Sequence, residues 1–136
     1  RGLVGEIIRR LEAKGLKIIG LKMMRVSPEL ARRHYQEHEG KDFYTALVDY
    51  ICSCPVVVIA VTGPDAVAVV RGLMGPTHGA KAPAGTIRGD LSVSMRYNLV
   101  HGSDSVESAR RELELFFAPG EVLDYDRPLL KWCWQC

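Results

Sequence analysis

The sequence has no long hydrophobic run and no strong excess of charge of one sign. No apolar stretch reaches the roughly 20 residues that span a bilayer, and the N-terminus lacks a secretory signal pattern, so we expect a cytoplasmic protein without a membrane partner. The net charge is only +2, from 18 basic and 16 acidic residues, so nothing here requires nucleic acid as a partner. With 136 residues, the chain is predicted to form a single domain, residues 1–136.

Cysteine is also scarce, and the four cysteines occur as two close pairs, Cys52 with Cys54 and Cys133 with Cys136. A CxC and a CxxC together can bind zinc, but the first pair lies in an apolar segment at short spacing and lacks the glycine of a zinc knuckle. The CxxC does not begin a helix after a strand, which disfavours a thioredoxin-type redox role. Free thiols are therefore the preferred interpretation, with the zinc site as the alternative.

Several common signatures of catalysis and nucleotide binding are absent. The sequence contains no GxxxxGK[ST] phosphate loop, no GxGxxG after a strand, no HExxH, no serine nucleophile elbow and no kinase catalytic loop. The candidate for catalysis is instead a histidine, His101, which is preceded in the sequence by three candidate phosphate-binding residues. These are Arg71 at a helix end, Thr77 in a loop rich in glycine and proline, and Arg88.

Apolar periodicity predicts alternating helices and strands over the chain. The irregular segment 76–85 is too long for a plain turn, and loops of this length are often functional. The aromatic tail, residues 121–136, is expected to lie across its own subunit or a neighbour. The predicted helices are 3–15, 27–38, 43–53, 64–75 and 106–117, and the predicted strands are 16–26, 56–61 and a run at Asn98. This order, without an internal repeat, fits an α+β domain.

His101 stands where a strand-like run ends and a helix begins. Asp104 and Ser105 are good N-cap types, and Asp104 with Glu107 has the spacing of a capping box. A helix start presents free N–H groups and a partial positive charge, which favour anions and a neutral imidazole. Neutral imidazole is a nucleophile, so His101 is a candidate catalytic residue; the alternative is a packed or surface histidine.

The segment Asn98-Leu99-Val100-His101-Gly102-Ser103-Asp104 resembles the N-x-x-H-G-S-D signature of nucleoside diphosphate kinases. The resemblance continues through residues 1–8, 71–75 and 83–90 and covers nearly the whole chain. It implies a ferredoxin-like α+β fold, with an antiparallel sheet flanked by helices. It also implies a ping-pong exchange of the γ-phosphate between nucleoside triphosphates and diphosphates, in which the histidine matching His101 becomes a phosphohistidine.

The resemblance implies roles for further residues. Glu112 matches the glutamate that orients the catalytic imidazole, and Ser103 matches its neighbouring hydroxyl. The positions that match phosphate, ribose and base contacts are Arg71, Thr77, Arg88, Asn98, Tyr35, Phe43 and Leu47. From the residues alone, the aromatic ones are better explained as the core of a helical hairpin, and the charged ones as solvated side chains.

The resemblance also implies cofactors and partners. Mg²⁺ is held mainly by the phosphates of the nucleotide, so no metal site made by the protein itself is predicted. The chain is expected to be a homo-oligomer assembled from dimers, either a hexamer or a tetramer.

Departures from the family pattern leave an alternative function open. The first family strand, with a Lys-Pro-Asp motif, would precede Arg1 and is missing from this numbering. Cys54 replaces a glycine and Gly79 a loop proline, and residues 61–63 replace Trp-Glu-Gly. The alternative is therefore a catalytically impaired scaffold that acts by oligomerisation or by binding nucleotides or nucleic acid.

Overall fold

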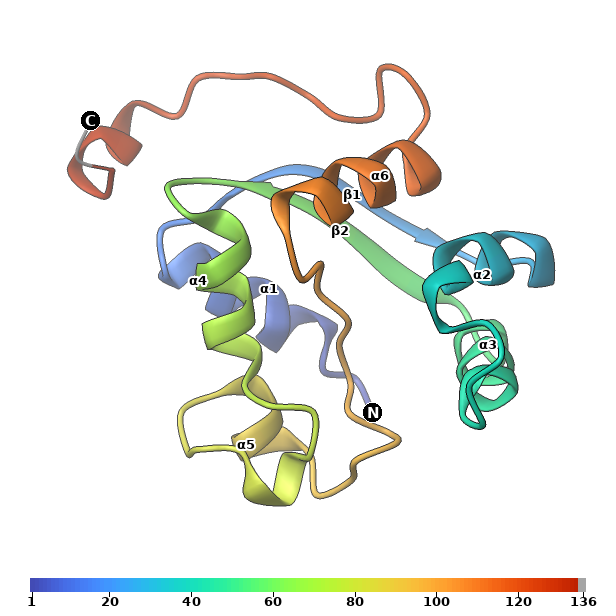
Figure 1. The fold of residues 1–136 in the computed structure, drawn as a ribbon. Coiled ribbons are helices and arrows are strands. Elements are labelled where there is room, and N and C mark those ends of the chain that lie inside the picture. Colours follow the sequence, from blue (N-terminus) through green and yellow to red (C-terminus); the bar gives the residue numbers. More distant parts are fainter. Residues whose placement is uncertain (135–136) are drawn as a thin grey trace.

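The structure, a computed structural model, describes residues 1–134 and shows a short antiparallel sheet flanked by helices (Figure 1). This arrangement confirms the predicted α+β class. In chain order the elements are α1 (Val4–Ala13), β1 (Lys17–Met24), α2 (Pro28–His34), the 3-10 helix η1 (Gln36–His38), α3 (Tyr44–Cys52), β2 (Val56–Thr62), α4 (Ala66–Met74), η2 (Gly79–Lys81), α5 (Ile87–Leu91), α6 (Val106–Phe116) and η3 (Pro128–Trp132).

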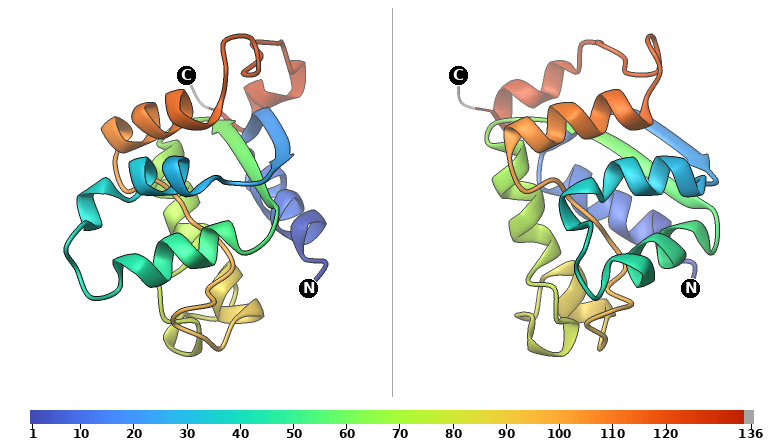
Figure 2. Two further views of the ribbon diagram at one scale, coloured as in Figure 1. Left: turned by 90° about the vertical axis from the view of Figure 1, so that its right-hand side faces the viewer. Right: turned by 45° about the vertical axis from the view of Figure 1, so that its right-hand side comes forward.

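Strands β1 and β2 pair antiparallel, with Ile18 opposite Val61 and Gly20 opposite Ala60. The register shifts between Ile18 and Gly20, as at a β-bulge. Helices α1 and α6 lie on opposite sides of this pair (Figures 1 and 2). A Cβ at Gly20 would lie 2.9 Å from the ring of Phe117, so the missing side chain allows the end of α6 to pack closely on β1.

The helical hairpin predicted from the sequence is formed by α2 and α3, and it contains a buried apolar cluster. Val26, Ala31 and Val48 form this cluster, and Phe116 at the end of α6 packs against it. The first helix of the hairpin begins as predicted, with the Oγ of Ser27 as its N-cap. It ends at His34 rather than at residue 38, because the chain tightens there into η1. The cluster thereby connects the hairpin with α6.

The strand predicted at Asn98 is wrong, because the residues around it form neither strand nor helix. Leu99 has a φ of 75°, which places it in the left-handed region and outside any strand. The carbonyls of Asn98 and Val100 accept hydrogen bonds from Arg88 instead of a neighbouring strand. The apolar residues here therefore belong to an irregular segment whose backbone is held by the side chain of Arg88. The segment before Asn98 also differs from the prediction, because it contains the helix α5, which was not predicted.

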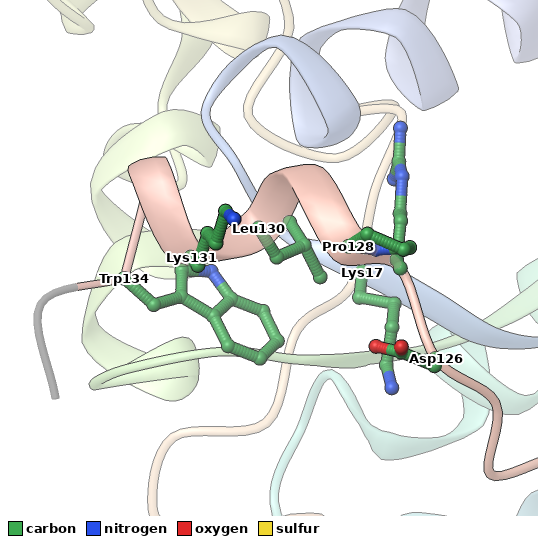
Figure 3. A pocket seen from close by; sticks show the side chains of 7 residues that line it. Lys17, Asp126, Pro128, Leu130, Lys131 and Trp134 are labelled. Carbon is green, nitrogen blue, oxygen red and sulfur yellow. The ribbon is translucent and has the colours of Figure 1, made fainter.

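The described part of the C-terminal tail, residues 121–134, lies along β1 of its own chain, which is one of the two predicted arrangements; residues 135–136 lie outside the described part. The Leu123 N–H donates to the carbonyl of Ile19 at 2.7 Å, and the Trp134 indole N–H donates to that of Gly15 at 2.8 Å. Lys17 and Trp134 line an open pocket of about 430 Å³ between the tail and the start of β1 (Figure 3). The tail therefore covers part of the free edge of the sheet.

The three described cysteines occupy different parts of the molecule. Cys52 and Cys54 lie at the end of α3, whereas Cys133 packs against Gly15 near the C-terminal end of α1. Among residues 1–134, no candidate metal-binding group includes a cysteine, and Cys136 lies outside the described residues. In the same part of the chain, no helix has the length and apolar character needed to cross a membrane.

Candidate active site

His101 lies in the irregular segment between α5 and α6. Of the two N-cap candidates, Ser105 takes the position: its Oγ accepts a hydrogen bond from the Ser108 N–H at 3.0 Å. Helix α6 is therefore capped by Ser105 and not by the capping box expected from Asp104 and Glu107. The His101 side chain is 49% exposed, so a ligand from solution can reach the ring.

Glu112 reaches His101 from α6. It follows the N-cap by about two helical turns, so its carboxylate lies on the face that looks back at the loop. Its Oε1 lies 3.2 Å from Nε2 of His101, and its Oε2 accepts a hydrogen bond from the Ser103 hydroxyl at 2.5 Å. Burial raises the pKa of Glu112, but the hydrogen bonds from His101 and Ser103 outweigh it, and the net pKa lies below its usual value. The charged carboxylate therefore engages Nε2 and leaves Nδ1 for another partner.

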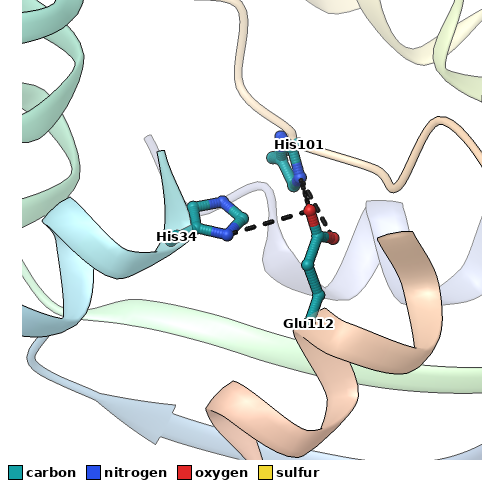
Figure 4. Close-up of side chains that lie close together, drawn as sticks. All are labelled: His34, His101 and Glu112. Carbon is teal, nitrogen blue, oxygen red and sulfur yellow. Dashed lines mark hydrogen bonds and ion pairs between the residues drawn. The ribbon is translucent and has the colours of Figure 1, made fainter. Parts of the chain in front are cut away.

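A second histidine, His34, points at the same carboxylate from the end of α2 (Figure 4). Its side chain is 2% exposed, and its Nδ1 lies 3.8 Å from Glu112 Oε1. Its ring meets that of His101 edge to face, with centroids 4.7 Å apart. Burial, strengthened by repulsion from His101, lowers the pKa of His34 to about 4, although the Glu112 carboxylate opposes this shift. His34 is therefore neutral at neutral pH.

Sequence reasoning missed His34. A usable signal was its spacing, because it follows Leu30 and Ala31 by four and three residues and so shares their face of the helix. Ala31 is fully buried and Leu30 packs on the apolar cluster, which places His34 on the inner side of the hairpin. Neither residue indicates that Glu112 lies opposite.

Two arginines hold the loop on either side of His101. The Nη2 of Arg88 donates to the carbonyl of Val100 at 2.6 Å, and the Nη1 of Arg71 donates to the carbonyl of Gly102 at 3.2 Å. These carbonyls belong to the residues directly before and after His101. Both guanidinium groups thus lie beside the histidine, and two adjacent cations favour a polyanion such as a phosphate chain.

Arg88 also organises the backbone around the site. It is 8% exposed and stands in α5, where the N-cap is Thr86. Besides its contact with Val100, it donates to the carbonyls of Gly75 at 2.9 Å and Asn98 at 3.2 Å. Burial, with a smaller contribution from the positive charge of Arg71, lowers the pKa of Arg88. Most of its N–H groups are used by the protein, so this side chain both holds the loop and presents charge.

The remaining predicted phosphate and ribose contacts are less tightly grouped. The side-chain amide of Asn98 donates to the carbonyl of Met95 at 2.9 Å, and its Oδ1 lies 3.4 Å from Nη2 of Arg88. This places Asn98 in the same network as Arg88. Thr77 is exposed in the loop between α4 and η2.

The predicted base contacts lie on the hairpin. The Tyr35 ring stands edge to face with His101, with centroids 6.3 Å apart, and burial raises the pKa of Tyr35 to about 12. Phe43 is 51% exposed at the start of α3, and Leu47 lies half-buried one turn further along that helix. The structure therefore places Tyr35 beside the histidine and Phe43 at the surface, where Lys41 Nζ lies 5.7 Å from the centroid of its ring.

Comparisons with known proteins identify the family of this chain. A family model described as "Nucleoside diphosphate kinase" matches residues 1–122. The chain is 50% identical over 135 residues to a nucleoside diphosphate kinase of Desulforamulus reducens, covering 99% of this chain and 91% of that protein. It is 52% identical over 132 residues to one of Thermomicrobium roseum, covering 97% and 89% of the two chains.

A solved structure supports the same assignment. The halophilic nucleoside diphosphate kinase from Halobacterium salinarum in complex with CDP is 47% identical and superposes with a TM-score of 0.96, covering 99% of this chain and 90% of that one. The fold class expected from the sequence is thereby confirmed. The chain belongs to the nucleoside diphosphate kinase family.

Proposed function

We propose that this protein is a nucleoside diphosphate kinase that exchanges the γ-phosphate between nucleoside triphosphates and diphosphates through a phosphohistidine at His101. The observation that carries the proposal is the contact between Nε2 of His101 and the Glu112 carboxylate. An ionised carboxylate is only an acceptor, so it keeps the proton on Nε2 and leaves the lone pair on Nδ1.

The exchange proceeds in two steps at Nδ1. In the first, Nδ1 attacks the γ-phosphorus, the N–P bond forms, and the nucleoside diphosphate leaves with the electrons of the broken P–O bond. In the second, a terminal oxygen of another nucleoside diphosphate attacks the same phosphorus, and Nδ1 regains its lone pair. Glu112 stabilises the positive charge that the ring carries between the steps, while Ser103 holds the carboxylate in place. Ping-pong kinetics follow from this scheme.

The two arginines supply the positive charge that phosphoryl transfer needs. The reaction spreads charge over the non-bridging oxygens and requires mainly positioning and electrostatic stabilisation. Arg71 and Arg88 lie on either side of His101 through their contacts with Gly102 and Val100, which supports a role on the phosphate chain. Thr77 and Asn98 are proposed to bind a phosphate and the ribose.

Mg²⁺ is proposed to arrive with the nucleotide. In residues 1–134, the one group of three clustered potential ligands contains two imidazoles, whereas Mg²⁺ prefers an octahedral set of oxygens. This group does not suit Mg²⁺, and the phosphates would hold the ion, which neutralises charge on the β- and γ-oxygens.

The base is proposed to lie against the hairpin, on Phe43 with Leu47 and Tyr35 nearby. Stacking on an aromatic face is tolerant of the base, because every base has a π-face. The exposure of Phe43 supports this role.

We further propose a cytoplasmic homo-oligomer, hexamer or tetramer. Leu21 and Met23 lie two residues apart on β1, so they share a face of the strand, and both are exposed, which supports burial against another copy. The scaffold alternative is less well supported, since the contacts of Glu112 with His101 and Ser103 are those a nucleophilic imidazole needs.

Incubation with γ-labelled ATP tests the proposal. The protein is expected to acquire a label that acid removes and base preserves, as phosphohistidine requires, and His101→Gln is expected to remain unlabelled. His38→Gln, which removes a histidine from η1, serves as the matched control and should keep the label. A label that persists in His101→Gln, or one that survives acid as a phosphoserine does, contradicts the assignment.

A further inference from the structure

His34 contributes nothing to the two-step exchange, yet it is buried against the residues that perform it. Its Nδ1 is buried and has no hydrogen-bond partner among residues 1–134, and Oε1 of Glu112, towards which it points, is 3.8 Å away. A buried polar atom without a partner typically costs about 1–3 kcal/mol, so such atoms call for an explanation. The orientation of this nitrogen towards Glu112 and His101 suggests a ligand that all three could share (Figure 4).

The three side chains present a compact set of donor atoms. One ligand atom each from His34, His101 and Glu112 can be chosen so that all lie within 4.8 Å of one another. Oε1 of the carboxylate lies 3.2 Å from His101 Nε2 and 3.8 Å from His34 Nδ1, while Oε2 accepts a hydrogen bond from Ser103 and lies 3.3 Å from His101 Nε2. Ligand atoms around a tetrahedral zinc ion, with bonds of about 2.0–2.2 Å, lie roughly 3.3 Å apart. Small side-chain rotations therefore suffice to close the set.

The chemistry of these donors selects the kind of metal. Two imidazole nitrogens and one carboxylate oxygen are the ligands of the three-residue zinc site that leaves a fourth position open. First-row transition metals accept such a set, whereas Mg²⁺ and Ca²⁺ prefer oxygen ligands. The fourth position would be taken by water, because the His101 side chain is 49% exposed and connects the group to solvent.

We propose that His34, His101 and Glu112 form an inhibitory site for Zn²⁺ or a similar divalent transition-metal ion in the nucleotide-free protein. On binding, the metal replaces the proton on His101 Nε2, which passes to solvent, and it takes Oε1 of Glu112. The metal then draws electron density from the ring and occupies the carboxylate that would stabilise a phosphorylated imidazole. Metal binding and phosphorylation of His101 are thus antagonistic. The inhibition rests on the function proposed above, whereas the binding itself does not.

Zinc binding is best measured on the full chain without nucleotide, because nucleotides bind the ion themselves. With the thiols alkylated by iodoacetamide, titration calorimetry with ZnCl₂ is expected to give one site per chain. His34→Phe, which retains a ring of similar size, and Glu112→Gln, which retains an oxygen, are each expected to weaken binding at least tenfold. His38→Phe is the matched control and should bind as the unmodified sequence does. Circular dichroism verifies that each variant is folded.

Cobalt absorption identifies the ligands independently of affinity. Co²⁺ is expected to give the intense visible bands of a four-coordinate site in the parent protein, and these bands should be lost in His34→Phe and Glu112→Gln. Equal zinc affinity in the parent and in both folded variants would overturn the site. So would a thiolate-to-cobalt charge-transfer band in unalkylated protein together with loss of binding after alkylation, because the cysteines would then be the ligands.

The inhibitory part is tested with γ-labelled ATP added after preincubation with ZnCl₂. Each variant is compared with its own rate in the absence of zinc. The parent protein should lose at least tenfold in the rate of His101 phosphorylation and regain it with a chelator, whereas His34→Phe should lose less than twofold. A parent protein that binds zinc but is phosphorylated at the same rate overturns the inhibition. A parent protein that is never phosphorylated instead contradicts the proposed function and leaves the binding result intact.

Discussion

The histidine end of the candidate site and its hairpin end are built differently. At the histidine end, Glu112 contacts both His101 and Ser103, and Arg88 is 8% exposed with its N–H groups bound to three carbonyls. At the hairpin end, Phe43 is 51% exposed and Leu47 is half-buried. The contacts at the histidine end fix the positions of its side chains, whereas the exposed surface at the hairpin end can accept nucleotide bases of different shape. With the proposed function, we therefore expect the rate to depend on the histidine end and the affinity on the hairpin end.

The largest effect is expected from Glu112→Gln, which removes the negative charge that contacts the His101 imidazole at the histidine end. An amide cannot stabilise positive charge on the ring, and it can also donate a hydrogen bond to Nε2, which favours the wrong tautomer. The rate of His101 phosphorylation is expected to fall about 100-fold, the size seen when one electrostatic contact of a transition state is removed. Rapid-quench measurement of labelled protein checks this. A loss of less than threefold would show that the carboxylate does not act on the ring.

A glycine substitution tests whether the rigid end depends on close backbone packing. A Cβ at Gly89 would collide with the carbonyl of Pro83, so Gly89→Ala must displace α5 and with it Arg88. The free energy of unfolding is expected to fall by about 1–3 kcal/mol, as for other overpacked sites. Gly72→Ala in α4 is the control, because a Cβ there would meet no atom of residues 1–134 within 4 Å apart from its own stretch of helix, and it should be neutral or stabilising. Urea denaturation measures both, and equal stabilities would contradict the packing argument.

Phe43→Ala tests the hairpin end by removing its aromatic face. Stacking of one base contributes about 1–3 kcal/mol, so KM for the nucleotide is expected to rise about tenfold while kcat changes little. Phe43→Tyr should preserve the parent KM, because the ring remains. Steady-state kinetics with a purine and a pyrimidine nucleotide measure these changes. A large fall in kcat with an unchanged KM would reverse the division of labour between the two ends.

The smallest effect concerns α1, where Arg10 forms an ion pair with Asp90 of α5. Hydrogen bonds from Arg9 and Arg10 lower the pKa of Glu6 from 4.5 to about 2. A lowered pKa in the folded state stabilises the fold above pH 4.5, and this contribution is lost as the pH falls towards 2. Glu6→Gln should therefore flatten the acid limb of a thermal stability curve slightly. Glu114→Gln, on the exposed face of α6, should leave it unchanged; equal curves for both variants would contradict the prediction.

Prediction from the sequence succeeded where the determining interactions are local. The periodicity of residues 106–117 located α6, and Ser27-Pro28 located the start of α2, because caps and apolar spacing act within one or two turns. The single-domain assignment and the individual binding roles stay predictions. Prediction failed at Asn98, where apolar residues resembled a strand. The carbonyls there are taken by Arg88, whose approach depends on the packing of α5 and cannot be read from neighbouring residues.

The sequence alone therefore determined which side chains are available for the chemistry: a histidine before a helix, a glutamate two turns along that helix, and arginines earlier in the chain. Tertiary packing alone decided which atoms of these residues meet. Packing placed the Glu112 carboxylate beside Nε2 of His101 and buried His34 opposite the same carboxylate. It also brought Arg71 and Arg88 to the backbone carbonyls of the residues that flank His101. The physical reason is that helix spacing specifies the face of a residue, whereas the partner of that face is selected by burial across elements that lie far apart in the chain.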